Sequence, residues 1–255
     1  MSLVVVLRTC DHTTVHPERG PRFIDVPKHI LIKKCLVSLL ESIRLARHIT
    51  DICMHVIDDR SAPDTIEYIK NKIENYGIGY EFETCSEPGY NASAYKQFEV
   101  CRDSNADWVY SVEDDYLHFP ECISQMLLMS DRFSRITGSS VAIRPDDDLF
   151  LYSPNNAHSR KSSIILHGDD RHWRTIYSSH NTIFASPDIF RNYWHLFASL
   201  AAYFKRLNID EDKSINLIWE RIPLFSPIPD LAVHVSQNNE PAFTDYKSLW
   251  ETIRI

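Results

Sequence analysis

Three consecutive acids, Glu113-Asp114-Asp115, directly follow an apolar, strand-like segment at residues 108–112. Carboxylates packed this closely repel one another and are costly to keep ionised unless a positive charge lies between them. Mg²⁺ or Mn²⁺ meets this need, because one or two carboxylates and a substrate phosphate complete its coordination shell. A solvated acidic turn is the competing interpretation. The flanking chain has to decide between the two.

The first half of the chain alternates short apolar segments with helical patterns, which is typical of a parallel sheet covered by helices. The expected strands are residues 3–7, 52–57, 80–84 and 108–112, and the expected helices are residues 28–47, 63–76 and 91–103. Ligands of such sheets bind at the carboxyl ends of the strands. Arg8-Thr9, Asp58-Asp59 and the acidic triplet each follow a strand, so we expect them to line one crevice.

The second half of the chain loses this rhythm. The expected strands are residues 140–143, 163–166, 175–185 and 231–235, and the expected helices are residues 187–206 and 210–220. Internal repeats, low-complexity tracts and Gly/Ser linkers are absent from the sequence. The sequence therefore predicts a single continuous domain, with a nucleotide-binding half at about residues 1–130 and an acceptor-binding half at about residues 131–255.

Composition excludes several classes of protein. The chain has 255 residues, of which 44% are hydrophobic, so it can bury a full core. Its formal net charge of −8 argues against a general nucleic-acid binder, because there is no basic stripe to contact phosphates. No run of about 18 apolar residues and no signal peptide is visible, so neither a membrane span nor secretion is predicted. A cytoplasmic location is expected.

The pair of segments Val56-Ile57-Asp58-Asp59-Arg60-Ser61 and Val112-Glu113-Asp114-Asp115 resembles the GT-A glycosyltransferases, particularly their family 2-like members. The resemblance covers residues 3–130. It implies an α/β, GT-A (Rossmann-like) fold with a mixed, mainly parallel sheet flanked by helices. It also implies transfer of a sugar from a UDP, GDP or dTDP sugar to a hydroxyl group of a glycan or other acceptor.

Carried over to this chain, the family's motifs imply a role for each acid. Asp59 would bind the nucleobase, Asp114 the ribose, and Asp115 a Mn²⁺ or Mg²⁺ ion. The chain departs from the family in two places: Arg60 stands where the family has the glycine of Asp-Gly-Ser, and the Asp-x-Asp motif is Glu113-Asp114-Asp115. The second departure leaves Glu113 as an alternative ribose ligand.

Sugar transfer also needs a base. Displacing a nucleoside diphosphate develops negative charge on the leaving phosphate, which a divalent ion stabilises as a Lewis acid. The acceptor hydroxyl is a poor nucleophile, so an inverting enzyme needs a carboxylate base on the other face of the sugar. Within Asp210-Glu211-Asp212 we expect Asp212 to be this base, and Glu211 next. The alternative is that these acids only favour a helix amino terminus through its dipole.

Two further residues are candidates for the same site. His234 lies in the apolar segment 231–235 and is either a core histidine or, as the resemblance implies, a further metal ligand. Arg8 follows the first strand and would either contact the base or phosphates of the donor or pair with Asp59.

Two other acidic groups compete for the cation. Asp146-Asp147-Asp148 reads as a solvated turn, with a metal site as the alternative. Asp169-Asp170 lies in the segment 168–174, which has the composition of a mobile loop that contacts the donor or acceptor sugar. In the same segment Trp173 either stacks on a sugar or anchors the loop by packing.

Three other functions share parts of this pattern. A nucleotidyltransferase would show a glycine-rich loop after the first strand, but residues 9–14 contain no glycine. A two-carboxylate glycoside hydrolase would need neither a metal nor the acid after the second strand. A glycan- or nucleotide-binding protein of the same fold that lacks catalysis would keep Asp115 and dispense with Asp212.

Overall fold

A nine-stranded sheet forms the centre of the protein in a computed structural model that describes residues 1–12, 22–203, 210–236 and 240–255. Its strands are β1 (Ser2–Thr9), β2 (Asp51–Asp58), β3 (Tyr80–Thr84), β4 (Trp108–Glu113), β6 (Ala142–Ile143), β7 (Ile165–His167), β8 (His172–Ile176), β9 (Ile183–Ala185) and β10 (Leu224–Ile228). They lie in the order β3-β2-β1-β4-β9-β6-β10-β8-β7. The first four are parallel, and β9 runs antiparallel to both of its neighbours.

A second, two-stranded sheet lies beside the end of β4. It pairs β5 (Tyr116–His118) with β11 (Ala232–His234) in antiparallel fashion, and His234 stands opposite Tyr116. Only Asp114 and Asp115 separate β4 from β5. This pairing brings a segment from near the carboxyl end of the chain to the acidic residues that follow β4.

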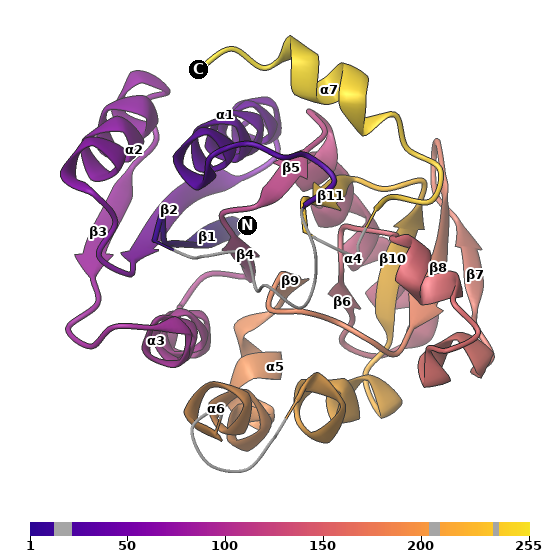
Figure 1. The fold of residues 1–255 in the computed structure, drawn as a ribbon. Coiled ribbons are helices and arrows are strands. Elements are labelled where there is room, and N and C mark those ends of the chain that lie inside the picture. The colour runs from indigo at the N-terminus through magenta and orange to yellow at the C-terminus, as the bar shows by residue number, and fades with distance from the viewer. Residues whose placement is uncertain (13–21, 204–209, 237–239) are drawn as a thin grey trace.

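Helices cover both faces of the large sheet (Figure 1). Those described are α1 (Lys28–Ala46), α2 (Pro63–Asn75), α3 (Tyr90–Asp103), α4 (Cys122–Thr137), α5 (Pro187–Asn192), α6 (Trp194–Tyr203) and α7 (Tyr246–Thr252), with 3₁₀ turns η2 (Leu149–Tyr152), η3 (Ala157–Arg160), η4 (Glu211–Lys213) and η5 (Ile215–Glu220). Helices α1, α2 and α4 pack in one core cluster, and α3, α5 and α6 pack in another. None of the helices in the described part of the chain is long and apolar enough to cross a membrane.

Helix α3 is fixed to the sheet by a buried glutamine. The side-chain amide of Gln97 donates hydrogen bonds to the carbonyl oxygens of Val6, at 3.0 Å, and Val112, at 2.9 Å. These carbonyls belong to neighbouring strands, β1 and β4. Because a buried carbonyl without a partner is costly, the two bonds favour one position of α3 against the strand ends. The first residues of α3 therefore reach the site described below.

The order and type of the elements predicted for the first half are confirmed, and three predictions for the second half are wrong. The expected strand at 175–185 is two strands, β8 and β9, joined by a polar loop at residues 177–182. The expected helix at 187–206 is α5 and α6, and its residues 204–206 lie outside the described residues. The expected helix at 210–220 is η4 and η5, which meet at Ser214, a residue with non-helical backbone angles.

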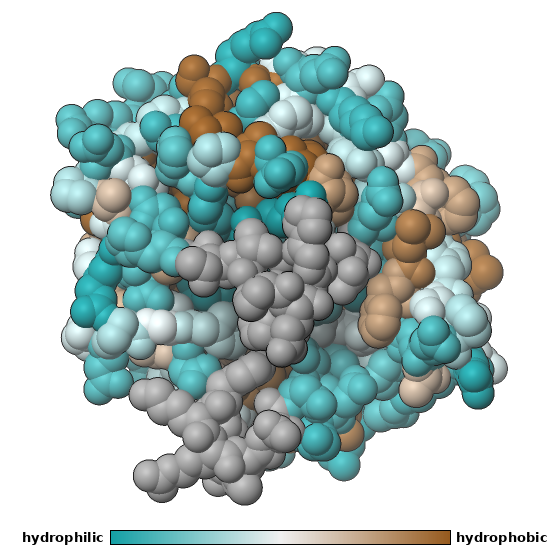
Figure 2. All heavy atoms as spheres, in the orientation of Figure 1, coloured by the Kyte–Doolittle hydropathy of each residue, from teal (hydrophilic) through white to brown (hydrophobic). Residues whose placement is uncertain are grey.

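Figure 2 shows apolar side chains in more than one place on this otherwise largely polar face, and one of these places is the region where η2 lies. Leu149 is 50% exposed and Phe150 is 44% exposed. Tyr152 contacts Phe243 edge to face, with ring centroids 5.7 Å apart.

The division of the chain into a donor half and an acceptor half stays a prediction.

Candidate active site

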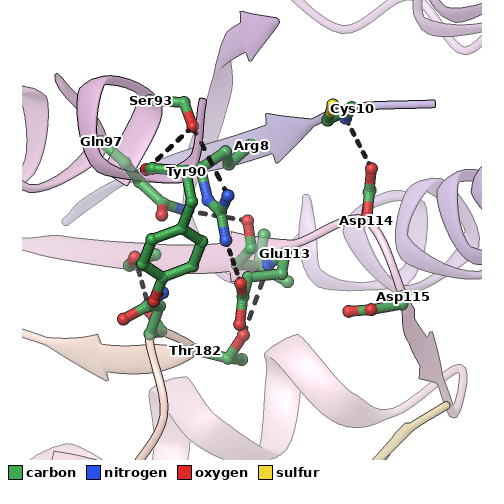
Figure 3. Close-up of polar contacts among 12 residues, drawn as sticks. Arg8, Cys10, Tyr90, Ser93, Gln97, Glu113, Asp114, Asp115 and Thr182 are labelled. Carbon is green, nitrogen blue, oxygen red and sulfur yellow. Dashed lines mark hydrogen bonds and ion pairs between the residues drawn. The ribbon is translucent and has the colours of Figure 1, made fainter. Parts of the chain in front are cut away.

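The three acids of the triplet at the end of β4 each contact a different partner. Glu113 forms an ion pair with Arg8 of the neighbouring strand β1, and Asp114 accepts a 2.7 Å hydrogen bond from the backbone N–H of Cys10 (Figure 3). Asp115 lies 3.6 Å from the imidazole Nε2 of His234. Asp114 is only 8% exposed. The interpretation of the triplet as a solvated turn is therefore wrong.

Lys28, the first residue of α1, lies between two of these acids. Its ammonium group forms an ion pair with Asp114 and lies 3.7 Å from Oδ2 of Asp115. Burial alone would lower the pKa of Lys28, but the two carboxylates outweigh it and raise that pKa. Burial raises the pKa of Asp114, whereas at Asp115 the charges of Lys28 and His234 outweigh burial and lower the pKa. The charged forms of Lys28 and Asp115 are therefore favoured.

His234 is held against Asp115 by the small sheet. The backbone N–H of Val235 donates to the backbone carbonyl of Asp115 at 2.8 Å. The ring of His234 stacks on that of Tyr116 at 4.5 Å, with 7° between the ring planes. Its ring centroid also lies 5.3 Å from that of His180. Burial, with the charges of Arg144 and His234, lowers the pKa of His180 well below its usual value, so this imidazole is neutral.

The side chains of Asp115 and His234 are of types that can bind divalent metal ions. Oδ1 of Asp115 is buried and accepts no hydrogen bond among the described residues, although a buried carboxylate oxygen normally has a partner. Within the described ranges no group of three or more His, Cys, Asp and Glu side chains is arranged to hold a metal ion by itself. A Mg²⁺ or Mn²⁺ site of one or two protein ligands, completed by substrate phosphates, fits this donor set.

Arg8 and Tyr90 form the other wall of the site. The guanidinium carbon of Arg8 lies 4.6 Å from the centre of the Tyr90 ring, a cation–π contact. Burial would lower the pKa of Arg8, but the carboxylate of Glu113 outweighs it and raises that pKa. The backbone N–H of Glu113 donates to Oγ1 of Thr182 at 3.3 Å. Arg8 therefore pairs with Glu113, and the alternative of a pair with Asp59 is wrong.

The turn after β2 is built around Asp58. Its carboxylate accepts hydrogen bonds from the Thr9 hydroxyl and the Ser61 backbone N–H, each at 2.9 Å. Arg60 has a φ of 57°, in the left-handed region that favours glycine. The turn therefore has a positive φ at Arg60, the position at which the GT-A glycosyltransferases that the sequence resembles have a glycine.

Asp59 is hydrogen-bonded to a residue that lines a cavity of about 510 Å³. Both of its carboxylate oxygens accept from the backbone N–H of Gly89, at 3.1 and 2.9 Å. Gly89 and Tyr90 line the cavity, together with Cys85, Ser86, Glu87 and Pro88. Its volume lies within the range of about 300–1,000 Å³ that is usual for small-molecule sites. Tyr90, which also contacts Arg8, connects this cavity to the acidic strand end.

Glu211 and Asp212 lie in different environments. Burial, with Glu113 as the largest charged contributor, raises the pKa of Glu211. Asp212 is exposed, and its Oδ1 accepts hydrogen bonds from the His158 ring at 2.7 Å and from the Asn216 amide at 2.8 Å. Burial raises the pKa of Asp212, but these two bonds, with the charges of His158 and Lys161, together outweigh it and lower that pKa. Of the two acids, Glu211 is thus the one whose pKa is raised by burial and by the charge of Glu113.

The prediction of a solvated turn at Asp146-Asp147-Asp148 is wrong. All three residues are at most 1% exposed. The buried guanidinium of Arg144 pairs with both Asp146 and Asp148, and Arg174 donates to Asp147 at 2.7 Å. Because these arginines already neutralise the acids, the cluster has no need of a metal ion.

The segment 168–174 belongs to a hairpin rather than to a sugar-binding loop. Its residues connect β7 to β8, and Trp173 is completely buried against Phe133, with ring centroids 5.5 Å apart. Asp169 pairs with Arg132 at 3.2 Å, and Asp170 pairs with Arg171 at 3.3 Å. Trp173 therefore packs in the core, and the interpretation that it stacks on a sugar is wrong.

Lys28 and His180 are site residues that the sequence analysis did not identify. Lys28 carried a usable signal, because a cation at the first position of a helix is opposed by the helix dipole and implies acids nearby. The amino terminus of a helix that follows a parallel strand also lies at the same sheet edge as the strand's carboxyl end. His180 carried no such signal, since the loop 177–182 was not distinguished from a strand.

No protein-family model matches this sequence, and no curated protein matches it. Solved structures do. The structure of S. aureus TarS 1–349 has 13% sequence identity and a TM-score of 0.53, and the match covers 89% of this chain and 60% of that one. TarS 1–349 in complex with UDP-GlcNAc has 12% identity and a TM-score of 0.52, with 100% and 62% covered. The chain thus spans about three fifths of the length of these structures.

At this identity the likeness concerns the fold. Both TarS structures have the GT-A architecture, and the large sheet, with its parallel strands β3-β2-β1-β4, agrees with the mixed, mainly parallel sheet flanked by helices that the resemblance implied. The protein has the GT-A glycosyltransferase fold.

Proposed function

We propose that the protein is a glycosyltransferase that transfers a sugar from a nucleotide-diphosphate sugar to a hydroxyl acceptor, with inversion at the anomeric carbon. The observation that carries the proposal is the position of Asp115: its buried, unbonded Oδ1 lies beside His234 at the carboxyl end of β4 in a GT-A fold. Arg8 and Lys28 add positive charge at the same strand ends. Such a site suits a diphosphate leaving group.

In this proposal Asp115 and His234 would hold a Mn²⁺ or Mg²⁺ ion. When bound, the ion supplies a Lewis acid for the charge that develops on the leaving diphosphate. The ammonium of Lys28 and the guanidinium of Arg8 attract the diphosphate and orient it along the strand ends. The bound UDP-GlcNAc in TarS supports a nucleotide-sugar donor.

The nucleobase would occupy the cavity beside Asp59, with Tyr90 as one wall. The N–H of Gly89, a cavity-lining residue, holds the Asp59 carboxylate, whose oxygens would also accept hydrogen bonds from the base. The ribose would then lie between the cavity and Asp114, with Glu113 as the alternative ligand. A UDP, GDP or dTDP sugar satisfies this arrangement.

Glu211 and Asp212 are the proposed bases, and the surroundings of the two carboxyl groups favour Glu211. A base must lie within reach of the acceptor hydroxyl and needs a pKa closer to neutrality than that of an exposed carboxylate. Burial and the charge of Glu113 raise the pKa of Glu211, whereas Asp212 is held by His158 and Asn216. In its ionised form Glu211 would remove the acceptor proton as the new glycosidic bond forms, while the nucleoside diphosphate leaves with the electron pair of the broken bond.

The first test is a calorimetric screen of UDP, GDP and dTDP, each with and without Mn²⁺, on the wild type and on Asp115→Asn. We expect one nucleotide to bind tightly with Mn²⁺ and to lose most of its affinity in the variant. Hydrolysis of the corresponding nucleotide sugar, and transfer to added hydroxyl acceptors, would then distinguish an enzyme from a binding protein of the same fold. Absence of binding by all three nucleotides would overturn the proposal.

A further inference from the structure

Lys28 is the cation closest to the proposed metal ligand among the described residues. Its side chain is 9% exposed, and its two carboxylate neighbours are Asp114 and Asp115. Each oxygen of Asp115 faces a different positively charged or chargeable group: Oδ2 lies 3.7 Å from Nζ of Lys28, and Oδ1 lies 3.6 Å from Nε2 of His234. An ion that binds Asp115 therefore has to share this carboxylate with an ammonium group.

A divalent ion bound to Asp115 and the ammonium group of Lys28 would repel each other. Divalent ions bind carboxylate oxygens at about 2.0–2.6 Å, so an ion on Asp115 would lie within a few ångströms of the Lys28 ammonium. Like charges this close repel each other, and the repulsion is stronger in a partly buried site than in water. With no further anion present, Lys28 and the ion therefore compete for Asp115.

We infer that Lys28 is a donor-phosphate-binding residue that neutralises Asp114 and Asp115 until metal ion and donor arrive together, and then contacts the diphosphate. This inference rests on the proposed function. The diphosphate adds the negative charge that the ammonium and the metal ion need in order to occupy the site at the same time. Binding of the ion and binding of the nucleotide are therefore coupled, each strengthening the other.

The charges of the site support this role. Arg8 forms its ion pair with Glu113, and its charge and that of Arg22 act on Asp115 only in addition to the nearer groups. Lys28 and His234 are the groups within 4 Å of the Asp115 carboxylate, and Lys28 is the ion-pair partner of Asp114 among the described residues. The dipole of α1 opposes a cation at the helix start, so the acids rather than the helix hold Lys28 there. The same dipole favours an anion such as a diphosphate next to Lys28.

A permanent structural ion pair is the competing explanation, and titrations of Lys28→Met separate the two. Mn²⁺ alone is titrated first, and then UDP, GDP and dTDP are titrated with Mn²⁺ present. Removing the ammonium should strengthen binding of Mn²⁺ alone by about tenfold, because a repulsive neighbour is lost. It should weaken the nucleotide that binds the wild type by about tenfold, because a charged hydrogen bond is lost. The two changes have opposite signs, which a loss of structure would not produce.

Lys33→Met is the matched control. Lys33 lies on the same helix, and its ammonium contacts the ring of Tyr68 at 4.7 Å rather than the acids. We expect both affinities to stay at the wild-type level. If Lys28→Met does not fold, Lys28→Gln keeps an N–H donor for Asp114, removes the charge, and carries the same expectations.

Unchanged affinity for Mn²⁺ and for the nucleotide in the Lys28 variants would overturn the inference and leave the proposed function intact. Weaker binding of Mn²⁺ alone would also overturn it, since the ammonium would then not compete with the ion. A wild type that binds none of the three nucleotides would instead overturn the proposed function, and this inference with it.

Discussion

Tyr116 and His234 lie opposite each other on the two strands of the small sheet, with ring planes 7° apart and centroids at 4.5 Å. The stacking and the strand pairing together fix the direction of the His234 ring. Nε2 of that ring faces Asp115 at 3.6 Å. The ring of Tyr116, which lies just after β4, thus orients the side chain of His234, which lies more than a hundred residues further along the chain.

Loss of His234 should lower the affinity for the metal ion more than it lowers the stability of the protein. We expect His234→Ala to reduce the affinity for Mn²⁺ in the presence of nucleotide by about tenfold or more, as for other groups that ligate or orient ligands of a metal. Calorimetry with Mn²⁺ at saturating nucleotide measures this, and His195→Ala on α6, an exposed histidine, is the control. Equal Mn²⁺ affinity in His234→Ala and wild type would remove His234 from the metal site.

Replacement of Glu211 should cost more activity than replacement of Asp212. We expect Glu211→Gln to lower kcat by about 10²–10⁴-fold, the usual contribution of a general base. Asp212→Asn should cause a smaller loss, because the side chain is exposed and held by His158 and Asn216. Transfer assays under saturating donor measure both. A larger loss in Asp212→Asn would return the base to Asp212.

When the pH is lowered, the activity of the wild type should begin to fall at a pH above the usual pKa of a glutamate. Burial and Glu113 raise the pKa of Glu211, and the base works only when it is deprotonated. The kcat of the wild type should therefore fall as the pH drops through this raised pKa. A pH profile whose acid limb is unchanged in Glu211→Gln would contradict the assignment.

Asp230 should make the protein less stable as the pH rises toward neutrality. Burial raises the pKa of this carboxyl from 3.8 to about 7. Between these values the folded protein binds more protons than the unfolded chain, so the free energy of unfolding decreases with rising pH, by at most about 1.4 kcal/mol per pH unit. Asp230→Asn should flatten this dependence, because the amide cannot ionise and still accepts from the Asp147 backbone N–H, which is 2.5 Å from Oδ1 of Asp230.

Urea unfolding between about pH 4 and pH 8 measures the slope. Asp245→Asn is the control, since Asp245 is an exposed cap of α7 and should leave the slope as it is in the wild type. An identical slope in Asp230→Asn and wild type would show that Asp230 does not titrate in this range.

Arg60→Gly should stabilise the protein. The φ of 57° at Arg60 costs an L-residue with a Cβ roughly 1–2 kcal/mol, and glycine removes this cost while losing part of the gain to its freer unfolded state. We expect a net gain of about 0.5–1 kcal/mol in the free energy of unfolding, measured by urea titration. Arg60→Ala removes the same charge but keeps a Cβ, so it should give no such gain. Equal effects of the two variants would assign the change to the lost charge.

The sequence was informative where local pattern and sheet geometry agree. Buried parallel strands read as apolar segments, and polar residues at their carboxyl ends must meet at one edge, so the convergence of Arg8 and the acidic triplet could be predicted. The position of His234 could not be derived from local pattern, because it depends on an antiparallel pair between β5 and β11. The family resemblance supplied that expectation, and the structure places His234 beside Asp115.

The sequence was misleading where the pairing of buried charges could not be read from residue types alone. A run of three acids is normally solvated, but Asp146-Asp147-Asp148 is buried because Arg144, two residues before it, and Arg174, from β8, neutralise it. The predicted strand at 175–185 is split because its polar residues 177–182 form a loop. Members of this loop form hydrogen bonds inside the fold; for example, the backbone N–H of Ser179 donates to the Asn216 side chain at 2.9 Å.

The position of β9 determines how the chain can be shortened. This strand, Ile183–Ala185, pairs with both β4 and β6. A fragment that ended near residue 130 would keep the acidic triplet but would leave β4 as a bare edge, open to strands of other molecules. Such a fragment would also lack His234 and Thr182. We therefore expect truncation at this point to give aggregates rather than an isolated donor-binding unit.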